Sequence, residues 1–340
     1  MTTDEQRCWE VLPKVSRSFA LAIKMLPDPL KIQLNVAYLI YRTIDTIEDS
    51  KMSILQKKKY LDMLISNLEN PKYEQNKIER LKIFLLSVPC TYEKVLLQNI
   101  DSVIRVFYNQ PSKIRRSILK WGRIMKEGMM KFQTKKIKTL NDQNRYSYYV
   151  AGVVGKLFNE LLYLNKIISK KTKKKLSTYA KGFGIALQKI NIIRDIRQDI
   201  KEKRYFWPIN LLKKYSLDYN NIFKKENRES AIKILKIMLE NTKKDIDDAI
   251  KYIKALPKNQ IKIRIFCLIP LFMALESYAA LIKNQKLFEL EEKVKIGRRA
   301  VYSIALKAAL VAESNSIIYK WFVEKVNKSF APNYKKHLRG

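Results

Sequence analysis

The sequence predicts an all-α fold, and three observations support this prediction. Glycine and proline are scarce, with 8 and 10 residues in a chain of 340, so few turns can interrupt long helices. The polar segments are rich in Lys, Glu, Leu and Ile, and no Asn-Gly or Asp-Gly hairpin turn separates alternating runs. Apolar residues make up 47% of the chain, which is ample for a core.

Prolines and apolar periodicity predict the helices of the N-terminal half. We expect a first helix over 1–12 that ends at Pro13, and a second over 16–25 that Pro27 breaks. The next helix carries the acidic segment 45–49. Further helices are expected over 54–68, 77–86, a stretch ending at Tyr108, 111–131 and 139–164.

In the C-terminal half, a second acidic helix is expected to end near Trp207, followed by helices over 229–256, 260–282 and 295–326. Residues 265–282 form an 18-residue apolar run, which reaches the lower length limit of a membrane span. Pro270 and Glu276 within it favour a core helix instead. No linker or repeat divides the chain, so we expect one domain over 1–340, with 317–340 a basic C-terminal tail.

Two aspartate pairs carry the strongest functional signal. Asp45 and Asp49 form one pair, and Asp195 and Asp199 form the other. Residues four apart share a helix face, so each pair presents two carboxylates in the same direction. The first face extends back through Arg42 and Tyr38, and the second through Asn191.

These residue types suit Mg²⁺ and diphosphate. Mg²⁺ prefers oxygen ligands and bridges to substrate phosphates, and an arginine beside each pair, Arg42 and Arg194, can bind phosphate oxygens. An acidic pair is more often a solvated helix face, which is how we interpret 245–248 among its lysines. The apolar flanks of the two pairs predict buried helices, where a metal would compensate the carboxylates.

The net charge of +36 suggests nucleic acid or an anionic membrane as a partner. The lysines are spread along almost every segment, however, and a compositional bias of the source genome explains that pattern equally well. No zinc finger or RNA-binding motif is present, so a specific nucleic-acid partner is not expected. A basic helical scaffold that binds nucleic acid or membrane stays a distant alternative to an enzyme.

Cysteine and histidine usage narrows the chemistry. The three cysteines, Cys8, Cys90 and Cys267, form no CxxC motif, which fits a reducing compartment and argues against a zinc site. His337 is the only histidine, which argues against His-based metal sites and Ser-His-Asp triads.

The chain ends suggest a cytoplasmic location. The polar N-terminus has no signal-peptide pattern, and no strongly hydrophobic C-terminal anchor is visible. Residues 317–330 are basic and amphipathic, which predicts either peripheral contact with the cytoplasmic face of an anionic membrane or a core-packing helix.

Several motifs, in order along the chain, resemble the squalene/phytoene synthase family, and squalene synthases most. They are Ser16-Arg17-Ser18-Phe19-Ala20, Tyr38 to Asp49, Tyr146 to Gly155, Gln188 to Asp199 followed by Phe206-Trp207-Pro208, Phe266 to Ala274, and Val294-Lys295-Ile296. The resemblance implies the class I terpenoid synthase helical bundle with a central cavity. It also implies a monomeric prenyltransferase that condenses two farnesyl diphosphates to squalene through presqualene diphosphate, using Mg²⁺ and NADPH.

The resemblance also implies roles for individual residues. Metal ligands would be Asp45, Glu48, Asp49, Asn191, Asp195 and Asp199. Substrate contacts would include Ser16, Arg17, Phe19, Tyr38, Arg42, Gln188 and Arg194. Tyr146 would lie near the reacting carbocation, and Arg17, Arg42, Arg194, Lys295 and Arg298 would contact NADPH.

Two positions depart from the family pattern. Gln198 stands where many relatives have Glu, and Gly297 stands where squalene synthases often have an arginine for NADPH. Arg298 or Arg299 could substitute for the latter. A non-reductive relative that makes presqualene diphosphate, dehydrosqualene or phytoene therefore remains an alternative.

Overall fold

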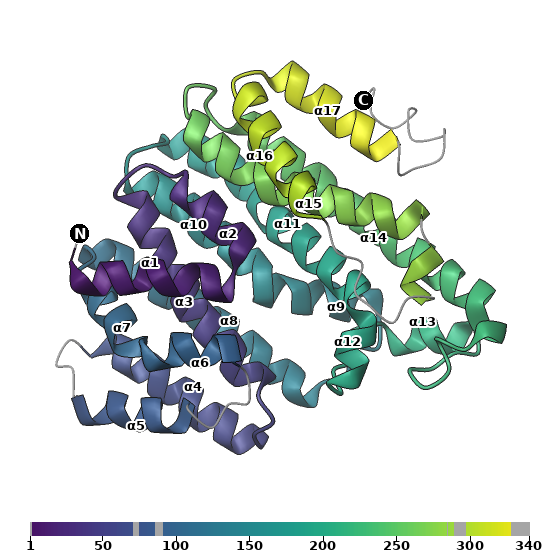
Figure 1. Cartoon of the computed structure of the whole chain (residues 1–340), viewed down its shortest axis with the longest axis horizontal. Coiled ribbons are helices and arrows are strands. Elements are labelled where there is room, and N and C mark those ends of the chain that lie inside the picture. The colour runs from purple at the N-terminus through teal and green to yellow at the C-terminus, as the bar shows by residue number, and fades with distance from the viewer. Residues whose placement is uncertain (1, 71–74, 86–90, 284, 289–296, 328–340) are drawn as a thin grey trace. The chain divides into compact units, whose positions relative to one another are not determined.

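The computed structural model describes residues 2–70, 75–85, 91–283, 285–288 and 297–327. Every regular element in these ranges is a helix, which confirms the all-α prediction (Figure 1). The chain groups into two compact units, one of residues 1–135 and 153–174 and the other of 136–152 and 175–340. The expectation of one domain stays a prediction.

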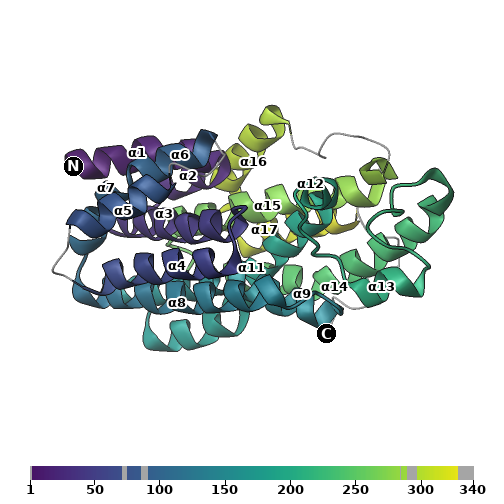
Figure 2. The same cartoon turned by 90° about the horizontal axis from the view of Figure 1, so that it is seen from below.

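The first unit is a bundle around α3 (Leu30–Asp49), which contacts α1, α4, α7 and α8. In Figure 2, α4 and α8 run side by side next to α3. The other helices of this unit are α1 (Thr3–Val15), α2 (Arg17–Lys24), α4 (Ile54–Glu69), α5 (Gln75–Leu85), α6 (Thr91–Gln98), α7 (Ile100–Tyr108), α8 (Ser112–Thr134) and α10 (Val153–Leu164). α3 is therefore packed against several other helices of this unit.

Two predicted boundaries in this unit differ from those in the structure. α1 continues through Pro13 to Val15, so the predicted end at Pro13 is wrong by one short turn. A proline near a helix end removes only one hydrogen bond, and the Ser16 N–H still donates to the Leu12 carbonyl at 2.9 Å. The predicted helix ending at Tyr108 is divided at Asn99 into α6 and α7.

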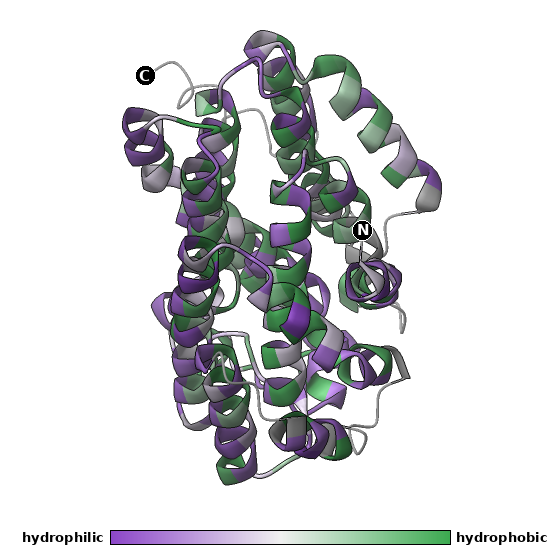
Figure 3. Cartoon of the chain, turned by 90° about the vertical axis from the view of Figure 1, so that its left-hand side faces the viewer, coloured by the Kyte–Doolittle hydropathy of each residue, from purple (hydrophilic) through white to green (hydrophobic). Residues whose placement is uncertain are grey.

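The second unit packs α14 (Arg228–Ala255), α16 (Arg298–Val311) and α17 (Asn315–Asn327) against α15 (Ile261–Lys283). Its remaining elements are α9 (Leu140–Ser147), a π-helix over Tyr148–Gly152, α11 (Lys170–Arg194, from residue 175 on), α12 (Ile196–Lys201), α13 (Ile209–Lys214) and short 3₁₀ turns at Lys225–Asn227 and Gln285–Phe288. Figure 3 shows apolar and polar residues alternating around most helices, as expected for helices that bury one face.

α15 is the core helix that the sequence favours. Within the described part of the chain it is the one helix long and apolar enough to cross a membrane, over Ile261–Leu281, and 72% of its most apolar window is buried. Glu276 within it forms an ion pair with Lys325 of α17. Burial by its neighbours accounts for its apolar composition.

A fully buried arginine, Arg264, explains why the predicted helix over 295–326 is two helices. Its guanidinium donates to the carbonyls of Ile253 and Leu256, each at 2.9 Å, and to that of Ala312. These carbonyls lie at helix C-termini, where a cation is favourable. The Ser314 hydroxyl then accepts from the Ile317 N–H at 3.3 Å and begins α17.

Two further predicted helices are interrupted. Residues 139–164 form α9, the π-helix and α10 in place of one helix. The second acidic helix pauses at Asp195, and α12 ends at Lys201, before Trp207. Both interruptions fall beside predicted site residues.

Candidate functional site

The first acidic motif forms a three-carboxylate group at the end of α3. Carboxylate oxygens of Asp45, Glu48 and Asp49 all lie within 4.8 Å of one another. Glu48 is buried, Asp45 is half-buried and Asp49 is exposed. The helical spacing thus brings together the residues that the sequence selects, and their oxygen ligands suit Mg²⁺.

Glu48 is the most unusual member because its side chain is only 5% exposed. Gln133 donates to its Oε1, whereas its Oε2 is buried and has no hydrogen bond. The Lys57 ammonium donates to the backbone carbonyl of Glu48 at 2.6 Å and to Gln133 Oε1 at 2.8 Å.

Burial, followed by the charges of Asp49 and Asp45, raises the pKa of Glu48 well above its usual value. An uncompensated buried carboxylate is costly. A divalent cation at this group would offset that cost, so the residues fit Mg²⁺.

Arg42 connects this group to a residue that the sequence analysis missed. One guanidinium nitrogen, Nη1, donates to Asp45, and the other, Nη2, donates to Glu93 Oε1 at 2.6 Å. Burial alone would lower the pKa of Arg42, but Asp45, Tyr38 and Glu93 together raise it. Glu93 lies in the first turn of α6. No sequence spacing connects it to α3, and only its place at a helix start marks it.

Tyr38, one turn before Arg42, joins α3 to α2. Its ring stacks on Phe19 with 5.6 Å between centroids. Burial raises its pKa, and a hydrogen bond to Ser16 opposes that rise. Ser16 also begins α2, since its hydroxyl accepts from the Phe19 N–H at 3.3 Å. These three residues therefore lie close together, and their contacts with substrate stay predictions. The side chain of Arg17 is outside the described residues.

The second acidic motif keeps its register across the pause at Asp195. The Asp195 N–H donates to the Asn191 carbonyl at 2.8 Å, and the Asp199 N–H to the Asp195 carbonyl at 2.9 Å. Asn191, Asp195 and Asp199 therefore follow helical spacing, as predicted. Gln188 and Arg194 are half-buried on α11.

Arginines pair with both carboxylates of this motif. Arg194 binds Asp195 through two bonds, Nε to Oδ1 at 3.0 Å and Nη2 to Oδ2 at 2.7 Å. Arg204 Nη2 lies 2.9 Å from Oδ1 of Asp199, which is 7% exposed. Sequence reasoning missed Arg204, although a basic residue soon after an acidic helix could have indicated it.

Tyr146 lies in the same unit as the second motif. Its buried ring stacks on Phe206 with 4.7 Å between centroids. The adjoining Trp207 donates from Nε1 to the Ile192 carbonyl at 3.2 Å, which ties this segment to α11. The aromatic pair and the aspartate helix are thus held together by one stretch of chain.

The small residues after Tyr146 allow close backbone packing. A Cβ atom added to Gly184 would lie 2.0 Å from the Ala151 carbonyl oxygen in the π-helix. Only glycine permits that approach. Gly184 therefore seats α11 against the segment that follows Tyr146.

The interpretation of 245–248 as surface is wrong for Asp245. Lys189 of α11 is almost fully buried, and its ammonium lies 2.5 Å from Asp245 Oδ2 and 2.9 Å from the Asn241 carbonyl oxygen. Burial lowers the pKa of Lys189, and Asp245 opposes that shift. This ion pair fixes α11 against α14.

The predicted NADPH residues of the C-terminal half cannot be placed. Lys295 and the side chain of Arg298 lie outside the described residues, although Arg298 begins α16. Gly297 is the residue before that helix. Their roles stay predictions.

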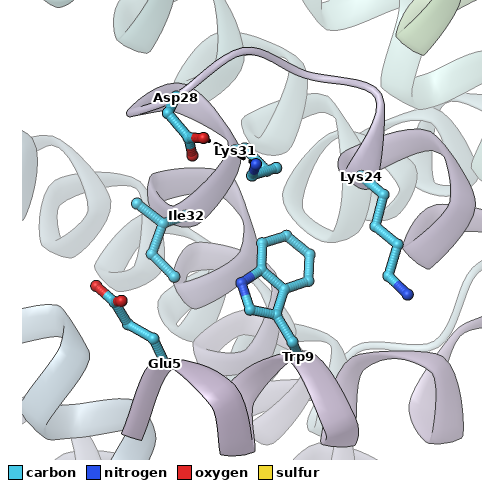
Figure 4. Close-up of a pocket in the computed structure, with 6 residues that line it drawn as sticks. All are labelled: Glu5, Trp9, Lys24, Asp28, Lys31 and Ile32. Carbon is cyan, nitrogen blue, oxygen red and sulfur yellow. Dashed lines mark hydrogen bonds and ion pairs between the residues drawn. The ribbon is translucent and has the colours of Figure 1, made fainter. Parts of the chain in front are cut away.

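A hollow of about 590 Å³ lies in the first unit, and Figure 4 shows the residues that line it. Glu5 and Trp9 of α1 point toward Asp28 and Ile32, and Lys31 lies 2.8 Å from Asp28. No predicted site residue lines it, so it is distinct from the acidic group of α3.

The squalene/phytoene synthase family model matches residues 12–300. The chain is 30% identical to a squalene synthase of Schizosaccharomyces pombe over 89% of its length, and it spans 65% of that relative. It is 31% identical to a squalene synthase of Rattus norvegicus, covering 93% of this chain and 73% of the relative.

A solved structure of TcSQS with the ligand BPH1237 is similar in fold. Its TM-score is 0.85 at 26% identity, covering 98% of this chain and 94% of the other. This likeness supports the terpenoid-synthase form of the predicted helical fold.

Proposed function

Since the chain belongs to the squalene/phytoene synthase family, we propose that it is a prenyltransferase that joins two farnesyl diphosphates head to head to give squalene. The observation that carries this proposal is the three-carboxylate group of α3, in which Glu48 is buried, with Arg42 beside it. An oxygen-only cation site next to a guanidinium is suited to a diphosphate group.

We assign metal binding to Asp45, Glu48 and Asp49, and to Asn191, Asp195 and Asp199. Mg²⁺, when bound, supplies the charge that stabilises the departing diphosphate. The buried Oε2 of Glu48, which has no hydrogen bond, supports a cation at the first motif. At the second motif Arg194 and Arg204 already contact the carboxylates, so binding there requires them to turn toward diphosphate oxygens.

The chain's own residues then guide the carbon chemistry. Arg42 and Arg194 hold diphosphate oxygens, while the buried Tyr146–Phe206 pair offers an aromatic face to an allylic cation. Attack by the second prenyl double bond and loss of one proton give cyclopropyl presqualene diphosphate. Water must be excluded, because it would convert the cation to an alcohol.

The second half-reaction is proposed from the family alone. Presqualene diphosphate loses its diphosphate and rearranges, and NADPH, when bound, supplies the hydride that gives squalene. We assign contact with NADPH to Arg17, Arg42, Arg194, Lys295 and Arg298. If this step is lost, the product is presqualene diphosphate or dehydrosqualene from farnesyl diphosphate, or phytoene if the substrate is geranylgeranyl diphosphate.

The test is an incubation with farnesyl diphosphate and Mg²⁺, with and without NADPH, followed by mass spectrometry of the extracted lipids. We expect squalene only in the presence of NADPH. Presqualene diphosphate or dehydrosqualene in both incubations would retain the condensation and overturn the reduction. No turnover of farnesyl or geranylgeranyl diphosphate would favour the basic scaffold.

We also propose that the protein is a cytoplasmic monomer that touches an anionic membrane. The sequence places this contact on residues 317–330, but the apolar side chains of Ile318, Trp321 and Phe322 in α17 are buried. We therefore place the membrane contact on α16. There Tyr302, Leu306 and Leu310 recur every four residues and are 69%, 66% and 77% exposed. An exposed apolar stripe on a chain of net charge +36 suits anionic lipid.

Cosedimentation with vesicles tests this contact. We expect binding to phosphatidylserine-containing vesicles and little to phosphatidylcholine alone. Leu306→Glu should reduce binding, whereas Ile83→Glu, at a 69% exposed position of α5, should not. Equal binding by both variants would exclude the α16 stripe.

A further inference from the structure

The Arg42 guanidinium is shared by carboxylates from two helices. Asp45 lies one turn further along α3 and binds Nη1, and Glu93 of α6 binds Nη2 at 2.6 Å. Arg42 and Glu93 are only 30% and 16% exposed. The pair is therefore largely shielded from solvent, where charge interactions are stronger than at the surface.

This pair differs from the bidentate ion pairs of the same unit. Arg105 binds Asp4 through Nε and Nη2, each at 2.8 Å, and Arg123 binds Glu69 through the same two nitrogens. Arg42, by contrast, uses one nitrogen for each carboxylate. Its Nε and the Oε2 of Glu93 are buried and make no hydrogen bond. Both partners thus retain unused hydrogen-bonding capacity.

Asp45 takes part in two interactions, the ion pair with Arg42 and the proposed ligation of Mg²⁺. As a proposed Mg²⁺ ligand it must direct its charge to the cation, yet it also compensates Arg42. With Glu93 present, Arg42 keeps a counter-charge when Asp45 turns to a metal. Without Glu93, Arg42 would depend on Asp45 alone, and the two interactions would compete.

We propose that Glu93 is a positioning residue that holds Arg42 and so frees Asp45 for Mg²⁺ and Arg42 Nε for a diphosphate oxygen. This inference rests on the proposed function, because it requires a cation at Asp45. Removal of a residue that orients a metal ligand without touching the metal typically lowers metal affinity by about 10- to 100-fold.

The measurement is binding of Mn²⁺ to the full chain without substrate, followed by the electron paramagnetic resonance of free Mn²⁺. Mn²⁺ prefers oxygen ligands as Mg²⁺ does. We expect Glu93→Gln to weaken binding by roughly tenfold, and Glu93→Asp, which keeps the charge, to restore part of it. Glu69→Gln, which neutralises the partner of Arg123, is the matched control and should bind like the wild type.

A double-mutant cycle shows whether Glu93 acts through Arg42. In an Arg42→Met background, Glu93→Gln should change Mn²⁺ affinity less than twofold. An undiminished tenfold effect in that background would mean that Glu93 acts on the cation directly, and would overturn the inference.

Failure of the proposed function gives a different result. If Asp45→Asn binds Mn²⁺ as the wild type does, the metal site itself is wrong. If Asp45→Asn loses binding while Glu93→Gln and Glu93→Asp bind like the wild type, only the role of Glu93 is wrong. Circular dichroism shows whether each variant is folded. If Glu93→Gln does not fold, Glu93→Asp and Glu93→Ala take its place. Wild-type Mn²⁺ affinity in both of these variants would overturn the inference.

Discussion

The aspartate motif of α3 and that of α11 and α12 share a four-residue spacing but differ in their charge compensation. In α3, three carboxylates lie within 4.8 Å of one another, and Arg42 contacts one of them. In the second motif, Arg194 binds Asp195 and Arg204 binds Asp199. The same spacing therefore accompanies a compact group of three carboxylates at one motif and arginine–carboxylate pairs at the other.

The backbone of the two motifs differs as well. α3 continues without interruption to Asp49, whereas the second motif changes helix at Asp195, which has φ −96° and ψ 8°. A continuous helix holds its carboxylates at fixed spacing before any ligand arrives. Under the proposed function, the first motif is preorganised for a cation, whereas the arginines of the second must move before a cation binds.

The largest expected difference between the motifs is in binding of the metal alone. Asp45→Asn should abolish Mn²⁺ binding in the absence of diphosphate, whereas Asp195→Asn should leave it within about threefold, because Asp195 is already paired with Arg194. Both variants should lose turnover of farnesyl diphosphate by about 10³-fold or more, since the metal supplies several kcal/mol of transition-state stabilisation.

Electron paramagnetic resonance and a product assay measure these two quantities. Equal loss of Mn²⁺ binding in both variants would remove the distinction between the motifs. Wild-type turnover in both would remove the site assignment altogether. Asp62→Asn, at a surface residue paired with Lys58 and Lys126, is the control for a neutralised carboxylate in the first unit.

Much of the first motif could be predicted from sequence, because its residues lie on one helix. Asp45, Glu48 and Asp49 come together through helical spacing alone. Glu93 could not be predicted, since it reaches Arg42 from 51 residues away through the packing of α6 on α3. Periodicity shows which face of a helix is buried, but it does not show which helix packs there.

The second motif was less predictable for a local reason. No proline or glycine marks the pause at Asp195, and the sequence therefore predicted a helix that continues toward Trp207. The pairing of Arg204 with Asp199 depends on the turn after α12, whose geometry the sequence does not show. The π-helix beside Gly184 was also missed, because the sequence predicts one helix over 139–164.

α11 and α3 each pack against a neighbouring element at a glycine position. Gly184→Ala should destabilise the fold by about 3 kcal/mol, because the new Cβ would lie 2.0 Å from the Ala151 carbonyl oxygen and backbone must move. Gly122→Ala, on α8 beside α3, should change stability by less than about 1 kcal/mol. Its Cβ would lie 3.2 Å from the Tyr41 ring and 3.8 Å from Ile44 Cδ1, both side-chain atoms, and alanine favours the helix.

Urea unfolding followed by circular dichroism measures both changes. Similar destabilisation by the two alanines would mean that α3 is seated as tightly as α11. A stable Gly184→Ala protein would show that the π-helix can shift without cost.

The smallest expected effect tests the paired charges of the second motif. Arg204→Met removes the guanidinium from Asp199, a carboxylate that is only 7% exposed, and should cost about 1–2 kcal/mol of stability. Because the carboxylate then lacks that cation, Mg²⁺ should stabilise Arg204→Met more than it stabilises the wild type. Urea unfolding with and without Mg²⁺ measures the loss of stability and the stabilisation by Mg²⁺. The control is Arg123→Met, at an exposed pair with Glu69, which should change stability by less than about 0.5 kcal/mol. If Mg²⁺ stabilises Arg204→Met and the wild type equally, Arg204 does not compete with a cation for Asp199. The two motifs would then differ in backbone geometry, but not in whether an arginine must leave its carboxylate before a metal binds.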